Sequence, residues 1–159
     1  MNPVIRPAEA ADIEPLARLF VEFHNFHARG VPTHLQPVGD PDEELIRSVG
    51  RLLEDERCAI FVASLDDQVV GFAEIYIKET DPSPAVVQRR YALLQSLAVS
   101  ESQRRLGLGR LLMEEAHRWA RGRGATAVET ETWEFPEGPL DFYAGLGYIT
   151  RKRRLVRSL

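Results

Sequence analysis

The strongest constraint on the fold is a glycine-rich turn at residues 104–109, between a β-rich run and a strongly patterned helix. Such a turn exposes several backbone N–H groups beside the positive end of the helix dipole. Its glycines let an anion approach the backbone closely, because no Cβ intervenes. The turn therefore predicts a strand–loop–helix unit that binds a phosphate, and by itself it does not say which phosphate.

Apolar periodicity and turn residues predict the element order β-α-α-β-β-β-α-β-α-β, an α/β fold with a mixed sheet. Asp12 is expected to cap the first helix, and Asp40 the second, with Pro41 at its first position and Glu43 at its third. The pair Asp66-Asp67 predicts a hairpin. The expected strands are residues 4–6, 59–65, 68–77, 91–99, 126–133 and 148–156, and the last two helices are residues 108–121 and 140–144.

Composition narrows the class of protein. A chain of 159 residues with 44% hydrophobic residues is expected to form one domain, residues 1–159, with a substantial core. Cys58 is the only cysteine, which excludes an internal disulfide and a zinc site built from cysteines. No apolar run approaches the ~18 residues of a membrane helix, and the first residues lack the layout of a signal peptide. We therefore expect a cytoplasmic protein that does not bind membranes.

The charge is unevenly divided along the chain. The formal net charge of −4 argues against a nucleic-acid partner, whose binding surface is normally basic. Residues 1–100 hold 16 acids and 9 bases, whereas residues 101–159 hold 8 acids and 11 bases. This imbalance favours a cationic partner for the first part of the chain and an anionic one for the second.

Several classes of phosphate site compete for the glycine-rich turn. A nucleotide P-loop would end in Gly-Lys-Ser/Thr, whereas this chain has Gly109-Arg110-Leu111. A dinucleotide fingerprint needs a third small residue where Leu112 stands, and the preceding strands form no first βαβ unit. An ordinary strand-to-helix turn without a ligand is the plain alternative. The remaining pattern, Gln/Arg-x-x-Gly-x-Gly/Ala, is matched directly by residues 104–109.

That pattern resembles the pyrophosphate loop of the GNAT superfamily, the general N-acetyltransferases. Arg104 follows Val99 by five residues, which is the family's spacing after its fourth strand. Three further segments resemble the family in the same order: Ile5-Arg6-Pro7-Ala8, Gln68-Val69-Val70-Gly71-Phe72-Ala73 and Phe142-Tyr143-Ala144-Gly145-Leu146-Gly147-Tyr148. The chain is identified as a bacterial-type, single-domain member. This resemblance implies a GNAT fold, with the sheet splayed between its fourth and fifth strands.

The resemblance also implies the donor site. Acetyl-CoA would be the cosubstrate, with no metal. The backbone of Leu97 and Val99 would pair with pantetheine in the splayed gap, and backbone N–H groups of residues 105–110 would hold the pyrophosphate. The side chains of Arg104, Arg105 and Arg110 would add charge-assisted contacts, unless they are simply solvated. The expected cofactor-binding residues are Leu97, Ala98, Val99, Arg104, Arg105, Leu106, Gly107, Leu108, Gly109 and Arg110.

The implied reaction is direct attack of a neutral amine on the thioester, without an acyl-enzyme. A backbone N–H of the fourth strand would polarise the carbonyl. Tyr143 is the expected catalytic residue, protonating the leaving thiolate, and the alternative is an aromatic ring packed under the cofactor. Gln95 stands where polyamine-type relatives carry an acid, so the base is open between water, Glu74 and Glu131. Pro136 replaces an asparagine that contacts the cofactor in many relatives, and proline has no backbone donor.

The acceptor site is expected between the first two helices, their connecting loop and the third and fourth strands. His24 and His27 lie at i and i+3, a spacing that suggests a metal, but no third ligand accompanies them. We therefore expect surface or loop histidines. The cluster from Arg151 to Arg154 is expected to form a charged edge strand, with nucleic-acid contact as the lesser alternative.

The function expected from these observations is an N-acetyltransferase, an acyltransferase that moves acetyl from acetyl-CoA to a primary amine of a cationic small molecule or peptide. Homodimers are common in the family. The alternative is an acyl-CoA-binding regulatory or sensor module with little turnover, which Gln95 and Pro136 motivate. A third hypothesis is an NAD-binding oxidoreductase. The sequence leaves the acceptor, the general base and the oligomeric state open.

Overall fold

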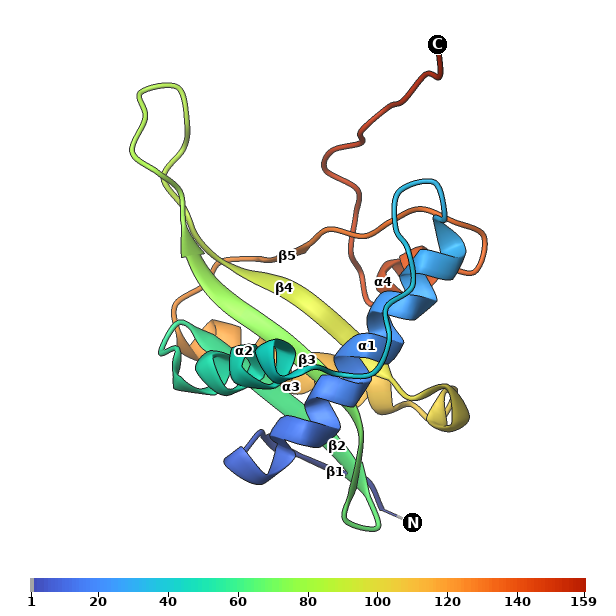
Figure 1. The fold of residues 1–159 in the computed structure, drawn as a ribbon. Coiled ribbons are helices and arrows are strands. Elements are labelled where there is room, and N and C mark those ends of the chain that lie inside the picture. Colours follow the sequence, from blue (N-terminus) through green and yellow to red (C-terminus); the bar gives the residue numbers. More distant parts are fainter. Residues whose placement is uncertain (1) are drawn as a thin grey trace.

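The computed structural model describes residues 2–159 (Figure 1). Strands and helices follow one another in the predicted order as far as α4. The elements are β1 (Val4–Pro7), η1 (Ala10–Asp12), α1 (Ile13–Gly30), α2 (Glu43–Glu54), β2 (Cys58–Leu65), β3 (Gln68–Glu79), β4 (Arg90–Val99), η2 (Glu101–Gln103), α3 (Leu108–Gly122), β5 (Val128–Thr130) and α4 (Leu140–Gly145). No helix in this part of the chain is both long and apolar enough to cross a membrane.

The five strands form one sheet in the order β1-β2-β3-β4-β5. Neighbouring strands are antiparallel except β4 and β5, which are parallel. The predicted α/β class with a mixed sheet is therefore confirmed. The hairpin between β2 and β3 is also confirmed, because Asp66 and Asp67 both adopt the left-handed backbone, with φ of 47° and 62°, that a two-residue turn requires.

Two aspartates stand at helix starts, but their contacts differ from the prediction. Asp12 directly precedes α1, yet its carboxylate makes no capping bond to that helix. It accepts instead from the Glu9 N–H at 2.8 Å and from the Arg6 guanidinium at 2.7 and 2.9 Å. The cap of α2 is Asp42 rather than Asp40, because Asp42 has the extended backbone that an N-cap needs and accepts a first-turn N–H at 2.8 Å.

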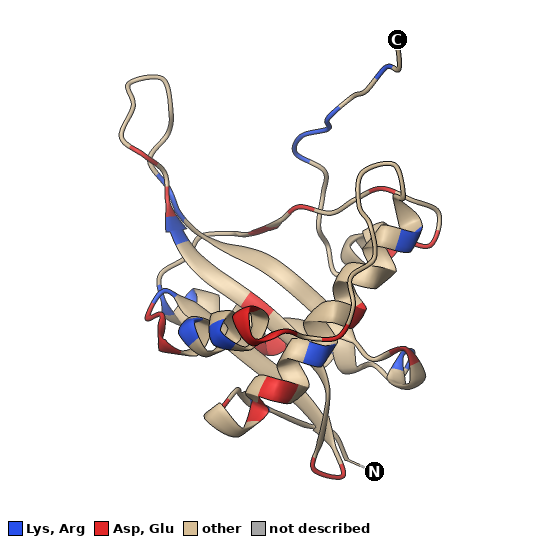
Figure 2. Cartoon of the chain, in the orientation of Figure 1, with Lys and Arg blue, Asp and Glu red and all other residues tan. Residues whose placement is uncertain are grey.

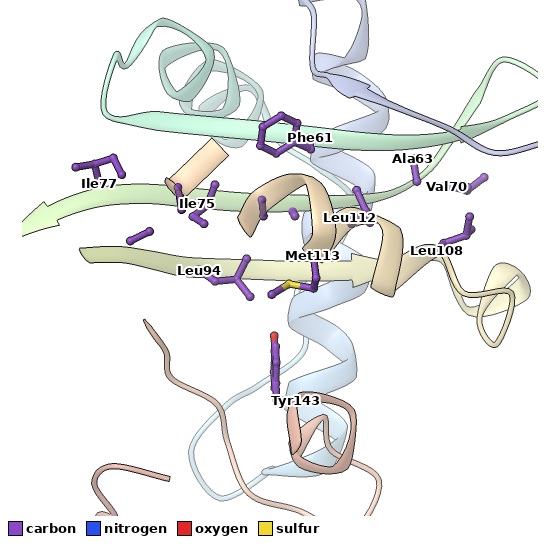
Figure 3. Close-up of a cluster of buried hydrophobic side chains, with 14 of the residues drawn as sticks. Phe61, Ala63, Val70, Ile75, Ile77, Leu94, Leu108, Leu112, Met113 and Tyr143 are labelled. Atoms are coloured by element: carbon purple, nitrogen blue, oxygen red, sulfur yellow. The ribbon is translucent and has the colours of Figure 1, made fainter. Parts of the chain in front are cut away.

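Helices cover both faces of the sheet, so the core has two layers (Figure 1). One layer lies under α1 and α2 and is built on Phe72 and Val62 of the sheet. The other lies under α3, and Tyr143 of α4 belongs to it (Figure 3). Since successive strand residues point to opposite faces, β3 alternately supplies one layer and then the other.

The sheet opens between β4 and β5. Their pairing is limited to three positions, Ala92 with Val128, Leu93 with Glu129 and Leu94 with Thr130. Strand β5 is thus shorter than the predicted residues 126–133, whereas β4 continues for five more residues to Val99. The predicted splay between the fourth and fifth strands is confirmed, and it begins at Leu94.

The predicted last strand, residues 148–156, was wrong. No strand follows α4, and the tail extends away from the body of the molecule (Figure 1). Its apolar side chains are exposed, with Ile149 74% and Leu155 84% accessible. A strand needs a hydrogen-bonding partner, and the four consecutive basic residues 151–154 leave few side chains to bury on this sheet. Figure 2 shows these basic residues along the tail.

Candidate active site

The free edge of β4 carries unpaired backbone groups. The Ser100 N–H donates to the Val70 carbonyl of β3 at 2.7 Å, and a Cβ placed on Gly71 would lie 2.9 Å from the Ala98 carbonyl oxygen. Ala98 therefore also faces β3, and because peptide groups alternate along a strand, Leu97 and Val99 face the opening toward β5. An extended ligand with its own amide groups would find partners along this edge.

The loop after β4 has the backbone of an anion site. Arg105 and Gly107 adopt positive φ, 69° and 81°, which turns the chain sharply before α3 begins at Leu108. The first hydrogen bond that closes the helix runs from the Leu111 N–H to the Gly107 carbonyl at 3.2 Å. The N–H groups of residues 108–110 therefore have no partner within the helix and point out of its positive end.

Gly109 is needed for close packing of α4, whereas Gly107 is needed for its positive φ. A Cβ on Gly109 would lie 3.3 Å from Cζ of Phe142, tighter than an ordinary contact. The small residue lets α4 pack directly against the first turn of α3. This packing places the motif of Tyr143 beside the glycine-rich loop, although 34 residues separate Gly109 and Tyr143 in the sequence.

The side chain of Arg104 has partners within the protein, on β4 and on α1. Its Nε donates to the Val99 carbonyl at 3.1 Å, and its guanidinium lies 4.7 Å from the centre of the Phe26 ring of α1. Arg105 and Arg110 are exposed, and neither forms an ion pair within residues 2–159. Arg104 thus joins the loop to α1, while the other two arginines remain available to an anion.

Tyr143 lies at the point where β4 and β5 separate. Its ring is 8% exposed, and in Figure 3 its hydroxyl points toward Leu94 and Met113. Thr130, whose hydroxyl interacts with it, also donates to the Leu94 carbonyl at 3.0 Å. Burial raises the pKa of Tyr143 to about 12, and the interaction with Thr130 only partly offsets this rise. The hydroxyl therefore keeps its proton at neutral pH and is a permanent donor.

A second tyrosine supports this position from behind. The rings of Tyr148 and Tyr143 lie 5.4 Å apart, and the Tyr148 hydroxyl is 2.7 Å from Nε2 of His117 on α3. Burial lowers the pKa of His117, so the imidazole is neutral at pH 7 and pairs with the hydroxyl without a charge. These contacts fix α4 against α3.

The structure separates the three candidates for a base. Gln95 is exposed at a bulge of β4, where the register shifts between Ser96 and Leu94. Glu131 is also exposed, just beyond the end of β5. Glu74 is only 4% exposed in the middle of β3, and its Oε1 accepts from the Tyr76 hydroxyl at 2.6 Å. Among these, Glu74 is the enclosed carboxylate.

Aromatic residues join the C-terminal half of α1 to the segment between β5 and α4, an arrangement that the sequence did not reveal. Phe135 packs 5.5 Å from Phe26 and 5.9 Å from His27, measured between ring centres. Trp133 lies 5.2 Å from His34 of the loop after α1. The two large aromatic residues Trp133 and Phe135 were a usable signal, because large apolar side chains are usually covered by a neighbouring element.

The histidines of α1 hold local structure. His24 Nε2 lies 2.8 Å from the Gln36 carbonyl and ties the following loop to the helix. His27 is buried, contrary to the expected surface position, and its Nδ1 lies 2.9 Å from the Phe23 carbonyl. Within residues 2–159, no group of three or more His, Cys, Asp or Glu side chains is arranged to hold a metal ion.

The segment between β5 and α4, together with the start of α4, borders an open pocket of about 410 Å³. It is lined by Glu134, Phe135, Pro136, Gly138, Leu140 and Asp141. Two of these residues are carboxylates, and Figure 2 shows acidic residues along this part of the chain. Because Phe135 also touches α1, the pocket adjoins the aromatic contacts described above, and its charge suits a cation.

A splayed sheet, a loop with free N–H groups at a helix N-terminus and a buried tyrosine at the point of splaying form the arrangement expected of an acyltransferase that uses an acyl-CoA donor. The model of the acetyltransferase (GNAT) family matches residues 14–148, and the chain belongs to this family. It is accordingly an acetyl-CoA-dependent N-acetyltransferase.

The chain is similar to one curated protein in sequence and to two solved structures in fold. The chain is 28% identical over 114 residues to an aminoglycoside N(6')-acetyltransferase type 1 of Salmonella typhimurium, covering 69% of this chain and 74% of that protein. The crystal structure of a tetramutant of the BH1408 protein from Bacillus halodurans is similar with a TM-score of 0.88, 24% identity and 98% and 99% coverage of the two chains. The aminoglycoside N-acetyltransferase AAC(6')-Iy in complex with CoA gives a TM-score of 0.72, 20% identity and 99% and 95% coverage.

Proposed function

We propose that this protein transfers the acetyl group of acetyl-CoA to a primary amine of a small polycationic molecule. The observation that carries this proposal is the free edge of β4, where Leu97 and Val99 face an opening that leads directly into the loop at Gly107. An extended pantetheine arm matches the edge, and a pyrophosphate matches the loop. One continuous surface therefore suits one long, anionic ligand.

The donor would be held mainly by the backbone. The free groups on β4 are the N–H and carbonyl of Leu97 and the N–H of Val99, since the Val99 carbonyl is already bound by Arg104. The N–H groups of residues 108–110 would bind phosphate oxygens, and Arg105 and Arg110 would add charge. Pro136 supplies no donor, so the segment after β5 would contribute shape rather than hydrogen bonds.

The reaction would proceed at the point where β4 and β5 separate. The Leu97 N–H faces the opening and would polarise the thioester carbonyl, which makes its carbon a better target for the amine. As the C–S bond breaks, Tyr143 would donate its hydroxyl hydrogen toward the departing sulfur. With a pKa of about 12 against about 8.5 for a typical thiol, Tyr143 stabilises the thiolate chiefly as a hydrogen-bond donor.

The acceptor is proposed from charge and from similarity. Carboxylates of Glu134 and Asp141 line the pocket beside α4, and the buried Glu74 lies on the face of the sheet covered by α1. A polycation would find complementary charge there. Two of the three proteins named above are aminoglycoside N-acetyltransferases, so aminoglycosides are the first acceptors to test.

The proposal is tested by following CoA release from acetyl-CoA with a panel of aminoglycosides, polyamines and lysine peptides. We expect turnover with at least one polycationic amine, and Tyr143→Phe should lower kcat by roughly 100-fold while acetyl-CoA still binds. Tyr91→Phe, which removes a hydroxyl at the start of β4, should leave the rate unchanged. Tight acetyl-CoA binding without release on the whole panel would show instead a binding module with little turnover.

A further inference from the structure

Glu74 is a buried carboxylate on the acceptor face of β3 that the donor site does not use, and Tyr76 binds it. Glu74 lies opposite Ser96 in the register of β3 and β4, two residues from the pair Phe72 and Ala98. Phe72 and Ala98 belong to the core layer under α1 and α2. Because side chains two residues apart share a face, Glu74 and Ser96 also face α1 and α2.

The carboxylate is enclosed without a cation. Glu74 is 4% exposed and forms no ion pair within residues 2–159. Its Oε1 is bound by the Tyr76 hydroxyl at 2.6 Å, whereas its Oε2 has no hydrogen bond in the described structure. No fully enclosed side-chain oxygen in this part of the chain is without a partner, so Oε2 still meets solvent. A buried carboxylate of this kind attracts a positive partner.

The register of the sheet fixes where Glu74 lies relative to the free edge of β4. Glu74 pairs with Ser96, the residue directly before Leu97, whose N–H faces the open side of β4. Neighbouring strands are separated by about 4.8 Å, so the backbone of Glu74 lies one strand away from the open edge of β4. An amine that approaches the thioester from the side of α1 would come in over the face of Glu74, and a bridging water would connect it to Oε2.

We propose that Glu74, oriented by Tyr76, is the base that accepts the proton of the acceptor ammonium. One N–H bond of the ammonium breaks, one O–H bond forms on Oε2 by way of the bridging water, and the neutral amine keeps its electron pair for attack. Glu74 is the catalytic residue, and Tyr76 is a positioning residue that acts through it. This inference rests on the proposed function, since it requires an amine acceptor.

Within the sheet, the neighbours of the pair leave Glu74 as the proton acceptor. On β3, burial and the neighbouring Glu74 raise the pKa of Tyr76, so its hydroxyl stays a donor, and the Lys78 ammonium lies 5.1 Å from the Tyr76 ring centre. On β2, burial raises the pKa of the Cys58 thiol to about 12. The facing residue of β4 is Ser96, which does not titrate.

The helices over this face add one titratable group. On α1 the nearest aromatic residues of the face are Phe20 and Phe23, which pack on Phe72, and His27 follows Phe23 by one turn. The buried face of α2 is apolar, and its arginines pair with glutamates on the exposed face. His27 therefore needs its own variant in any pH experiment on this site.

The experiment compares the pH dependence of kcat/KM for the wild type, Glu74→Gln, Tyr76→Phe, His27→Gln and Glu131→Gln, using the best amine of the acceptor panel. Glu74→Gln keeps the shape and the bond from Tyr76, and we expect kcat/KM at pH 7 to fall roughly 100-fold with the acidic limb flattened. Tyr76→Phe should move the acidic limb of the kcat/KM profile to higher pH, since a carboxylate without its hydrogen bond is protonated more readily. At high pH the kcat/KM of this variant should return to the wild-type value. Acetyl-CoA affinity should not change in either.

Three outcomes would overturn the inference. They are a wild-type pH profile in folded Glu74→Gln, loss of the acidic limb in Glu131→Gln or His27→Gln instead, and an unchanged acidic limb in Tyr76→Phe. The result for Tyr76→Phe tests the role of Glu74 even if Glu74→Gln does not fold, because Tyr76→Phe leaves the carboxylate in place. If the wild type acetylates no amine on the panel, that result counts against the proposed function. It is distinguishable from failure of this inference, because it requires no variant.

Discussion

The ring of Phe135 lies against the backbone of Gly30, the last residue of α1, so closely that a Cβ on Gly30 would be 2.5 Å from two ring carbons. Real side chains do not approach at this distance, so only glycine permits the contact. The same ring also meets Phe26 and His27. The contact fixes the distance between α1 and the segment after β5, which are the two sides of the proposed acceptor site.

Gly30→Ala should therefore alter the acceptor side alone. The new methyl displaces Phe135, so we expect the KM for the amine to rise about tenfold, equivalent to about 1.4 kcal/mol, with acetyl-CoA affinity unchanged. Steady-state kinetics with calorimetric titration of acetyl-CoA measures both. Gly122→Ala is the matched control, because Gly122 ends α3 and a Cβ there meets nothing within 4 Å. Equal effects of the two variants would contradict the prediction.

Gly107→Ala should weaken the donor side. Its φ of 81° lies in the left-handed region, which costs a residue with a Cβ about 1–2 kcal/mol. The loop is expected to relax away from its anion-binding shape, raising the Kd for acetyl-CoA by about tenfold. Gly124→Ala carries the same strain, at φ 78°, on the far side of α3. It should lower the thermal midpoint similarly yet leave the Kd unchanged; a Kd that rises in both variants would argue against a local role.

Arg104 should behave as a link between the loop and α1 rather than as a phosphate ligand. A cation–π contact with Phe26 predicts that Arg104→Gln and Phe26→Leu are not additive, with a coupling of about 1 kcal/mol in the free energy of unfolding. The salt dependence of acetyl-CoA binding should weaken in Arg105→Gln and Arg110→Gln and stay unchanged in Arg104→Gln. Urea denaturation and titrations at several salt concentrations check these two statements, and strict additivity would refute the first.

The ion pair between Arg6 and Asp12 should make the free energy of unfolding depend on pH. The hydrogen bonds from Arg6 lower the pKa of Asp12, so the carboxylate stabilises the fold above its unfolded value of about 3.9. That contribution disappears as the pH falls through the lower folded pKa. Asp12→Asn should cost about 2 kcal/mol at pH 7 and much less at pH 2. Glu14→Gln, which alters an exposed ion pair, should show little effect at either pH; a pH-independent loss in Asp12→Asn would contradict the argument.

Local signals in the sequence predicted where the glycine-rich loop and the motif around Tyr143 lie in the fold. The spacing from Val99 to Gly107 and the motif around Tyr143 depend on backbone requirements of a few adjacent residues, and such requirements can be read directly from residue types. Glycine at 107 meets a positive φ, as the motif implies. The strand at residues 148–156 was predicted wrongly, because apolar residues show that a segment can form a strand but do not supply a partner for it.

The acceptor side depends on contacts between distant segments. Arg104 was expected to face a phosphate, and only the position of α1 shows that Phe26 takes its guanidinium. Glu74 and Tyr76 are two residues apart on one strand, so the sequence places their side chains on the same face of the sheet. The packing of α1 and α2 over that face is what encloses the carboxylate.

The sequence by itself determined the family and the order of elements as far as α4, because these follow from motifs, from periodicity and from local conformational needs. The tertiary structure decided which carboxylate is enclosed, which arginine is free and which aromatic ring closes on Gly30. Those outcomes depend on burial and on contacts between segments as far apart as Gly30 and Phe135. The residue pattern along the sequence shows neither burial nor such contacts, because both depend on how the whole chain packs.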